Sequence, residues 1–275
     1  MKRLSLIVSM LALFVFVLAA CGKNDDTAGE EKTNIKVGTS PGPYSLLFLE
    51  AVKPILEEKG YTVEQVEFND LLQADVALAD GGVDLNVDQH TAYMDNFNEN
   101  KNADLVSLTP IPTVPAGLFP GKKNSLDELA DGDTIGIPND ASNAARAYAI
   151  LQKAELIKMK DGVEVMKATS QDIEENPRNL KIVEMDSAQI PRSLTDLDYG
   201  VVPGSIVYAS NMDPSTKLVS EDVLDHLVLV AVTTEKNKDL PWAKDVAAAY
   251  QSDEFKAYME EHNKDDYWFI PKELQ

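Results

Sequence analysis

The sequence predicts an α/β protein made of two lobes. Strand and helix patterns alternate along the chain after residue 33, and a proline-rich run at 109–115 interrupts them before the alternation restarts. Strands that alternate with helices form layers, in which helices cover a mostly parallel sheet. Two such sets indicate two lobes, with the second lobe inserted into the first.

The first set of elements begins at residue 34 and ends at the proline-rich run. Its first strand leads into a turn rich in Pro and Gly, and the helix that follows stops at Gly60. The alternation from Thr62 to Phe68 is typical of a strand with one solvent face. In order, we expect a strand over 34–38, a helix over 44–59, a strand over 62–68, a helix over 71–80, a strand over 83–87 and a helix over 91–100.

The second set lies between two expected crossings. Prolines exclude a central strand or a helix interior, so the run at 109–115 is expected to be an extended crossing. The apolar stretch 227–232 is expected to be a buried strand that forms the return crossing. We expect a short helix from the capping box at 125–128, strands over 134–137, 181–185 and 200–202, and helices over 142–154, 241–250 and 253–262. The lobe bounds are then 34–110 and 227–275 for the first lobe, and 111–226 for the second.

The N-terminus has the pattern of a secretory signal. A basic start precedes an apolar stretch from Leu4 to Ala20, which is short for a membrane span of about 20 residues. It ends in Leu18-Ala19-Ala20-Cys21-Gly22, which resembles the bacterial lipoprotein box, where the cysteine is lipidated and the signal is cut before it. We expect a signal peptide over 1–20, and a lipidated Cys21 on a flexible tether over 21–33. The alternative is a plain signal peptide with a cysteine near the cut.

Composition excludes several classes of protein. The chain has 275 residues, of which 44% are hydrophobic and 26% charged, as in ordinary globular proteins. Its 46 acidic residues against 25 basic ones argue against a nucleic-acid partner, which clustered Lys and Arg would have to neutralise. The net charge of −21 is interpreted as solvation and self-repulsion.

Enzyme motifs are sparse. The sequence contains none of the patterns GxxxxGK[ST], GxGxxG, HExxH and GxSxG. Its 3 histidines are scattered, and its 1 cysteine is assigned to the lipid anchor. We therefore expect no catalysis, no cofactor and no metal site.

Two groups of polar residues occupy strand ends, where ligands of open α/β sheets bind. Asp88, Gln89 and His90 stand where a strand passes into a helix, although Asp88 as a helix cap with exposed neighbours is an equal alternative. Asn143 and Arg146 share one face of the helix that follows the strand over 134–137. A helix N-terminus favours a bound anion, and the planar guanidinium of Arg can form two parallel hydrogen bonds to a carboxylate. The alternative is an Arg on the surface that pairs with an acidic residue.

Several stretches together resemble the MetQ/NlpA family of lipoproteins, the substrate-binding components of methionine-type ABC importers. The matching stretches are Asn86–His90 with Tyr93, Ile137–Asp140 with Asn143 and Arg146, Glu175–Lys181, Ala188–Leu194 and Tyr250–Asp253. The resemblance implies a two-lobed periplasmic-binding-protein fold with a ligand cleft between the lobes and two hinge crossings. It also implies that Arg146 holds a ligand carboxylate, that Asn143 and His90 supply hydrogen bonds, and that Tyr93 walls the site.

The chain departs from the family pattern at positions of the implied pocket. Asp88 stands where Phe is usual, and Asp70–Asp75 replaces a stretch that commonly reads Asp-Tyr-Val-Gln-Pro-Asn. The Asn that usually follows a late strand is replaced within Val202–Ser205. A buried carboxylate is unfavourable unless it is paired, so Asp75 or Asp88 in the pocket would require a cation from the ligand or the protein.

The leading hypothesis is a lipid-anchored, extracytoplasmic protein that binds methionine or a related amino acid. Its expected partners are the amino acid, an ABC permease with its ATPase, and the membrane through Cys21, with the protein itself a monomer. The alternatives are a binder of a more polar amino acid or small peptide, and a surface interaction lipoprotein with a degenerate site.

Overall fold

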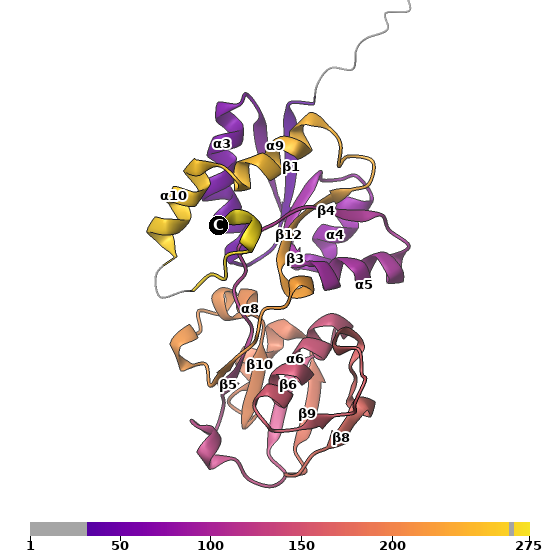
Figure 1. Cartoon of the computed structure of the whole chain (residues 1–275), viewed down its shortest axis with the longest axis vertical. Coiled ribbons are helices and arrows are strands. Elements are labelled where there is room, and N and C mark those ends of the chain that lie inside the picture. Colours follow the sequence, from indigo (N-terminus) through magenta and orange to yellow (C-terminus); the bar gives the residue numbers. More distant parts are fainter. Residues whose placement is uncertain (1–31, 264–266) are drawn as a thin grey trace, which may run out of the picture. The chain divides into compact units, whose positions relative to one another are not determined.

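The strands form two five-stranded sheets, each with its own helices (Figure 1). The computed structural model describes residues 32–263 and 267–275. The expected signal peptide, Cys21 and nearly all of the expected tether therefore lie outside the described residues. Among the described residues, no helix has the length and apolar character needed to cross a membrane.

The first sheet combines strands from both ends of the described chain. Its pairs β1–β2 and β1–β3 are parallel, whereas β12 runs antiparallel to β3 and β4. This mixture corrects the expectation of a mostly parallel sheet. Across the sheet the order is β2 (Thr62–Glu67), β1 (Asn34–Thr39), β3 (Leu85–His90), β12 (Leu229–Thr234) and β4 (Leu105–Pro110).

Helices before and after the inserted segment cover this sheet. The helix expected over 44–59 is a helical segment over 43–58 with one π-helical turn, η1, ahead of Pro54. Proline lacks the N–H and crowds the preceding turn, which accounts for the wider turn at that place. The helices are α2 (Pro43–Leu47), η1 (Phe48–Val52), α3 (Lys53–Glu58), α4 (Leu71–Ala79), α5 (Thr91–Lys101), α9 (Pro241–Tyr250), α10 (Asp253–His262) and the short η9 (Lys272–Leu274).

The second sheet takes its strands from the segment between β4 and β12. Its pairs β10–β6 and β6–β9 are parallel, while β5 runs antiparallel to β10 and β11. The order is β11 (Val219–Ser220), β5 (Gly117–Pro120), β10 (Tyr199–Val202), β6 (Thr134–Pro138) and β9 (Lys181–Met185), and a separate pair is β7 (Lys158–Met159) with β8 (Ile173–Glu175). The main helices of this part are α6 (Ala141–Lys153), α7 (Ile190–Ser193) and α8 (Gly204–Ala209), with 3-10 turns η2 (Leu126–Glu128), η3 (Val165–Lys167), η4 (Ser170–Asp172), η5 (Ser187–Gln189), η6 (Pro214–Thr216) and η7 (Asp225–Leu227).

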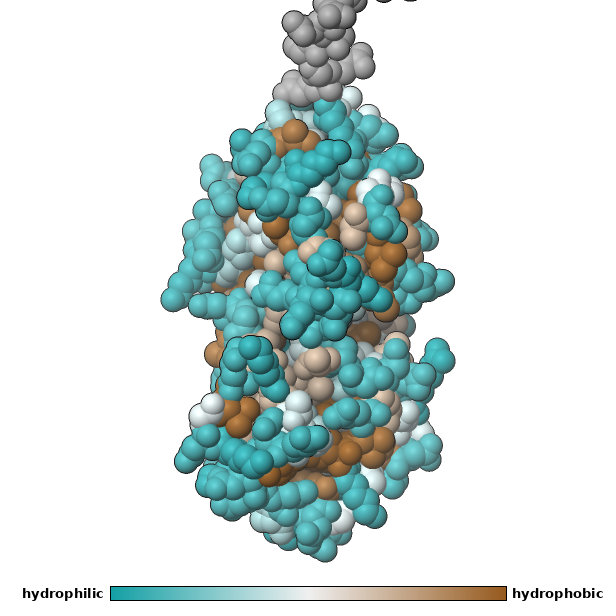
Figure 2. Space-filling view, turned by 90° about the vertical axis from the view of Figure 1, so that its right-hand side faces the viewer, coloured by the Kyte–Doolittle hydropathy of each residue, from teal (hydrophilic) through white to brown (hydrophobic). Residues whose placement is uncertain are grey.

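Each sheet has its own hydrophobic core. Trp242, Tyr250 and Phe48 belong to a core of the first sheet, and Tyr148 and Tyr199 to the core of the second. The face shown in Figure 2 is mainly hydrophilic, with smaller apolar areas, as the excess of acidic residues leads one to expect. Separate cores fit the expected lobes, although the boundaries at residues 110 and 226 remain predictions.

Two crossings join the sheets and are hydrogen-bonded to each other. Ile111 donates its N–H to the carbonyl of Leu229 at 2.8 Å, and Leu229 donates to the hydroxyl of Thr113 at 2.9 Å. Further along, the N–H of Glu221 reaches the carbonyl of Ala116 at 3.1 Å. The expected return strand therefore has two roles. Its first residues form a crossing, and from Leu229 onward it belongs to the first sheet, where Leu229 pairs with His90 at the end of β3.

The strand expected over 83–87 is shifted in the structure. β3 spans Leu85–His90, so Asp88, Gln89 and His90 belong to the strand and not to the connection after it. Polar residues are tolerated in this strand because Asn86 donates to the carbonyl of Gly38 at 3.1 Å, and Gln89 donates to Asp75 at 2.5 Å. The alternating pattern used to find strands does not capture such internally bonded side chains.

Candidate functional site

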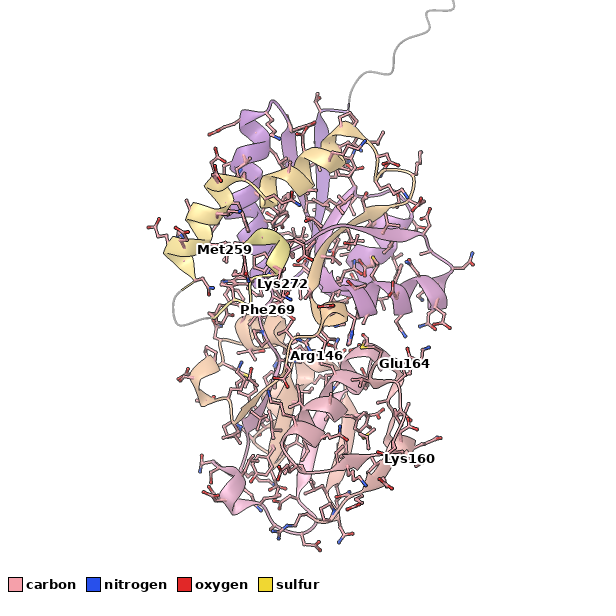
Figure 3. All side chains as sticks on the ribbon, in the orientation of Figure 1. Arg146, Lys160, Glu164, Met259, Phe269 and Lys272 are labelled. Atoms are coloured by element: carbon pink, nitrogen blue, oxygen red, sulfur yellow. The ribbon has the colours of Figure 1, made fainter. Side chains whose placement is uncertain are left out.

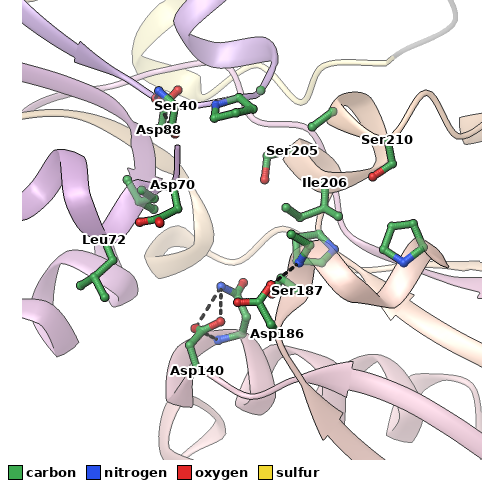
Figure 4. Close-up of a pocket in the computed structure, with 18 of the residues that line it drawn as sticks. Ser40, Asp70, Leu72, Asp88, Asp140, Asp186, Ser187, Ser205, Ile206 and Ser210 are labelled. Atoms are coloured by element: carbon green, nitrogen blue, oxygen red, sulfur yellow. Dashed lines mark hydrogen bonds between the residues drawn. The ribbon is translucent and has the colours of Figure 1, made fainter. Parts of the chain in front are cut away.

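A cavity of roughly 870 Å³ lies where loops of the two sheets face each other (Figure 4). Most of the loops that line it follow the carboxyl end of a strand, which is where open α/β sheets bind ligands, and Ser210 and Met212 follow helix α8. From the first sheet come residues of the β1–α2 turn, the β2–α4 loop, the end of β3, and Tyr93 in α5. From the second sheet come residues of the β6–α6, β9–α7 and β10–α8 connections.

The cavity is lined by more carboxylates than cations. Among the described residues that line it, the acids are Asp70, Asp88, Asp140 and Asp186, and the base is Arg192. Three of the acids cap helices: Asp70 accepts from the N–H of Gln73 at 2.9 Å, Asp140 from Asn143 at 3.0 Å, and Asp186 from Ala188 at 2.9 Å. At these three helix ends, the position at which a ligand anion would bind is occupied by a side chain of the protein.

Asp88 lies at the end of β3 and is held by two serines. Its Oδ2 accepts from the N–H of Ser40 at 2.8 Å and from its hydroxyl at 2.9 Å. Its Oδ1 accepts from the N–H of Ser45 at 3.0 Å and from its hydroxyl at 2.9 Å. Burial raises the pKa of Asp88, and these hydrogen bonds oppose the shift. Asp88 caps the start of α2, a helix distant in sequence, and not α5.

Asp75 and Gln89 lie behind the cavity wall and do not line it. Both are buried, and Gln89 Nε2 donates to Asp75 Oδ1 at 2.5 Å. Among the described residues, Asp75 Oδ2 and Gln89 Oε1 have no hydrogen-bond partner. Burial raises the pKa of Asp75 well above its ordinary value, and the nearby Asp88 adds to this.

The neutral imidazole of His90 connects the two sheets, since it hydrogen-bonds to α5 of the first sheet and to Asn143 of the second. Its Nδ1 accepts from the N–H of Tyr93 at 3.1 Å and so caps α5, while Nε2 lies 3.3 Å from Asn143 Oδ1. Because Nδ1 is the acceptor, Nε2 carries the proton and donates to Asn143. Burial and the charge of Arg146 lower the pKa of His90 to about 3. His90 does not line the cavity, whereas Tyr93 and Asn143 do.

Arg146 lies on α6, near the junction of the two sheets (Figure 3). It forms an ion pair with Glu221. Its Nε donates to Glu221 Oε2 at 2.5 Å, and Nη2 donates to Oε1 of the same carboxylate. Nη1 donates to Asn143 Oδ1 at 3.3 Å. Burial alone would lower the pKa of Arg146, but Glu221 raises it above its ordinary value. A guanidinium has about five N–H donors, so about two remain, but Arg146 is only 5% exposed and does not line the cavity.

A family model described as NlpA lipoprotein matches residues 35–271. The chain belongs to this family. The D-methionine-binding lipoprotein MetQ of Salmonella typhi is 39% identical over 240 residues, which cover 86% of this chain and 87% of that protein. The match confirms the family resemblance, and the family consists of substrate-binding proteins, so the chain is not an enzyme.

Solved structures of NlpA-like proteins share the fold. A putative lipoprotein from Ruminococcus gnavus has a TM-score of 0.82 and 35% identity, and the match covers 87% of this chain and 100% of that one. A nutrient-binding protein from Burkholderia cenocepacia, solved with bound methionine, has a TM-score of 0.79 and 36% identity over 86% of this chain and 99% of its own. These matches confirm the predicted fold class.

The sequence of this NlpA family member left three parts of the site unassigned. Glu221 follows the two-residue strand β11 in a stretch without a motif, so no local pattern pairs it with Arg146. Ser40 and Ser45 are ordinary turn and helix residues until folding brings Asp88 to them. Arg192 lines the cavity and lies in one of the stretches that carried the family resemblance, which is the signal that could have identified it.

Proposed function

We propose that the chain captures methionine or a related amino acid outside the cytoplasm and delivers it to an ABC importer. The observation that carries this proposal is the cavity at the strand ends of two hinged sheets, in a family whose relatives include a methionine-bound structure. Proteins of this architecture close around their ligand by a hinge motion, and the ligand favours the closed state.

The polar groups at the cavity suit the two charged ends of an amino acid. Asn143 and Tyr93 line the cavity, and the Oδ1 of Asn143 accepts hydrogen bonds from both His90 and Arg146. Arg146 does not line the cavity, so a contact with the ligand carboxylate requires that the N–H groups left free by Glu221 and Asn143 become accessible. The carboxylates of the wall face the ligand's ammonium.

The anchor remains a prediction because Cys21 lies outside the described residues. Relatives are named lipoproteins, among them Outer membrane lipoprotein 3 of Mannheimia haemolytica, 35% identical over 245 residues. Cys21→Ala in the full chain is expected to abolish incorporation of labelled palmitate and to move the protein from the membrane to the soluble fraction. Unchanged labelling would contradict lipidation at this cysteine.

Binding is tested by thermal unfolding of the full chain, purified in detergent, with each amino acid and a set of dipeptides. A specific ligand at about 100 times its Kd stabilises the folded state by about 2.7 kcal/mol, which raises Tm. A rise in Tm with methionine supports the proposed ligand. No rise with any amino acid or dipeptide would favour a surface interaction lipoprotein with a degenerate site.

A further inference from the structure

The cavity wall contains a half-buried carboxylate, that of Asp88. Asp88 accepts hydrogen bonds from Ser40 and Ser45, whose hydroxyl and amide groups are neutral. Among the described residues, Asp88 forms no ion pair with a Lys, Arg or His. Hydrogen bonds hold this carboxylate in place, but its negative charge remains without a counter-ion.

A second carboxylate lies behind the first. Asp75 is fully buried, its Oδ2 has no hydrogen-bond partner among the described residues, and its charge interacts with that of Asp88. Two neighbouring carboxylates, one buried and one half-buried, are unfavourable without a cation, since each raises the energy of the other when ionised. A cation from outside the protein relieves both.

More carboxylates surround this end of the cavity. Tyr93 lines the cavity, and after burial the causes that raise its pKa are the charges of Asp75, Asp140 and Asp70, in that order. The aromatic face of a Tyr also attracts cations. Asp70 and Asp88 lie on the wall formed by the first sheet, and Asp140 and Asp186 lie across from them (Figure 4). This part of the cavity therefore favours positive charge on a bound molecule.

We propose that the cavity selects amino acids or small peptides with a positively charged side chain, an ammonium or a guanidinium, and that Asp88 determines this selectivity. A neutral amino acid adds no net charge, because its carboxylate cancels its ammonium, whereas a basic one adds a positive charge to a negatively charged cavity. Arg192 is the one cation among the described residues that line the cavity. This inference rests on the proposed function of amino-acid capture, and it replaces methionine with a basic amino acid or peptide as the preferred ligand.

The first experiment compares matched ligands by isothermal titration calorimetry of the full wild-type chain in detergent. Lysine is compared with norleucine and arginine with citrulline, because each pair has nearly the same shape and differs in charge. Glycyl-lysine and glycyl-norleucine extend the comparison to dipeptides. We expect the charged member to bind about tenfold more tightly or better, consistent with the energies of close charge pairs.

The second experiment uses Asp88→Asn, which removes the charge and keeps the size of the side chain. We expect the preference for the charged member of each pair to fall about tenfold. Asp127→Asn is the matched control, because Asp127 is exposed on η2, outside the cavity lining, and the net charge changes equally. The control is expected to keep the wild-type preference.

Several outcomes would overturn the inference. Wild-type protein that binds norleucine, citrulline or methionine as tightly as lysine and arginine would overturn it while leaving amino-acid binding intact. An equal loss of preference in Asp88→Asn and Asp127→Asn would remove Asp88 from the explanation. If no amino acid or dipeptide binds, the proposed function fails as well. The wild-type comparison needs no variant, so poor folding of Asp88→Asn does not affect it.

Discussion

Both carboxylate oxygens of Glu221 accept hydrogen bonds from the guanidinium of Arg146, and Oε1 also accepts one from the N–H of Ala116 at 2.7 Å. The side chains of this pair are only 5% and 3% exposed for Arg146 and Glu221, respectively. Ala116 lies in the first crossing and Glu221 near the second, so this ion pair ties both crossings to α6. The guanidinium expected to hold the ligand is thus also part of the hinge.

Glu221→Gln is expected to destabilise the protein by about 3–5 kcal/mol, because it leaves the buried guanidinium of Arg146 without a counter-charge. Urea unfolding of the full chain in detergent measures the change. Asp222→Asn is the neighbouring control: Asp222 pairs with Lys153 at 2.5 Å, but its side chain is 76% exposed. That variant is expected to change stability by at most about 1 kcal/mol. Equal effects of the two variants would argue against a structural role for Glu221.

Replacing both members, Arg146→Met with Glu221→Leu, separates stability from binding. Removing a whole buried ion pair is often neutral or stabilising by about 1–4 kcal/mol, so the double variant is expected to fold. If Arg146 binds the ligand carboxylate, calorimetry should detect no binding of the best wild-type ligand. A folded double variant with wild-type affinity would exclude Arg146 from the binding site.

Asp75→Asn is expected to stabilise the protein by about 1–3 kcal/mol at pH 7, since it removes a buried carboxylate and supplies an N–H donor. The pKa of Asp75 is raised above 3.8 in the folded state, so folding takes up a proton. Its favourable contribution is therefore present below about pH 4 and lost as the pH rises through the folded pKa.

Urea unfolding from pH 4 to 7.5 checks this, and the gap between Asp75→Asn and wild type should widen as the pH rises. Asp80→Asn changes an exposed acid at the C-terminal end of the same helix, and the stability of this variant should run parallel to that of wild type. A pH-independent gap would show that Asp75 does not titrate differently in the folded protein.

His90 is expected to stay neutral in the folded protein well below pH 6.5, with its pKa lowered to about 3. Below pH 6.5 the imidazole of His90 binds a proton in the unfolded chain but stays neutral in the folded protein. The contribution of His90 is therefore present above pH 6.5 and lost as the pH falls toward the folded pKa. The ring resonances of His90, assigned by their absence in His90→Gln, can be followed by NMR. A midpoint near 6.5 would contradict the neutral link to Asn143.

Local sequence patterns were enough to predict several of the strands and helices whose ends line the candidate site. Asp140 and Asn143 stand where a strand meets a helix, and the structure has α6 begin there with Asp140 as its cap. The short antiparallel strands β4 and β5 were not predicted, because their prolines are typical of an irregular crossing. β3 was misplaced by about three residues at its end, since its polar residues are satisfied by partners far away in sequence.

The sequence alone determined the α/β class, the membership of the family and the strand ends at which a ligand site was expected, because these depend on periodicity and on residues close together in the chain. Only the tertiary structure decided which charges meet. Asp88 reaches Ser45 over 43 positions, and Arg146 reaches Glu221 over 75. Such pairs produce no periodic pattern in the sequence, because the distance between their members is set by how the sheets and crossings pack. They determine which charges of the cleft are available to a ligand.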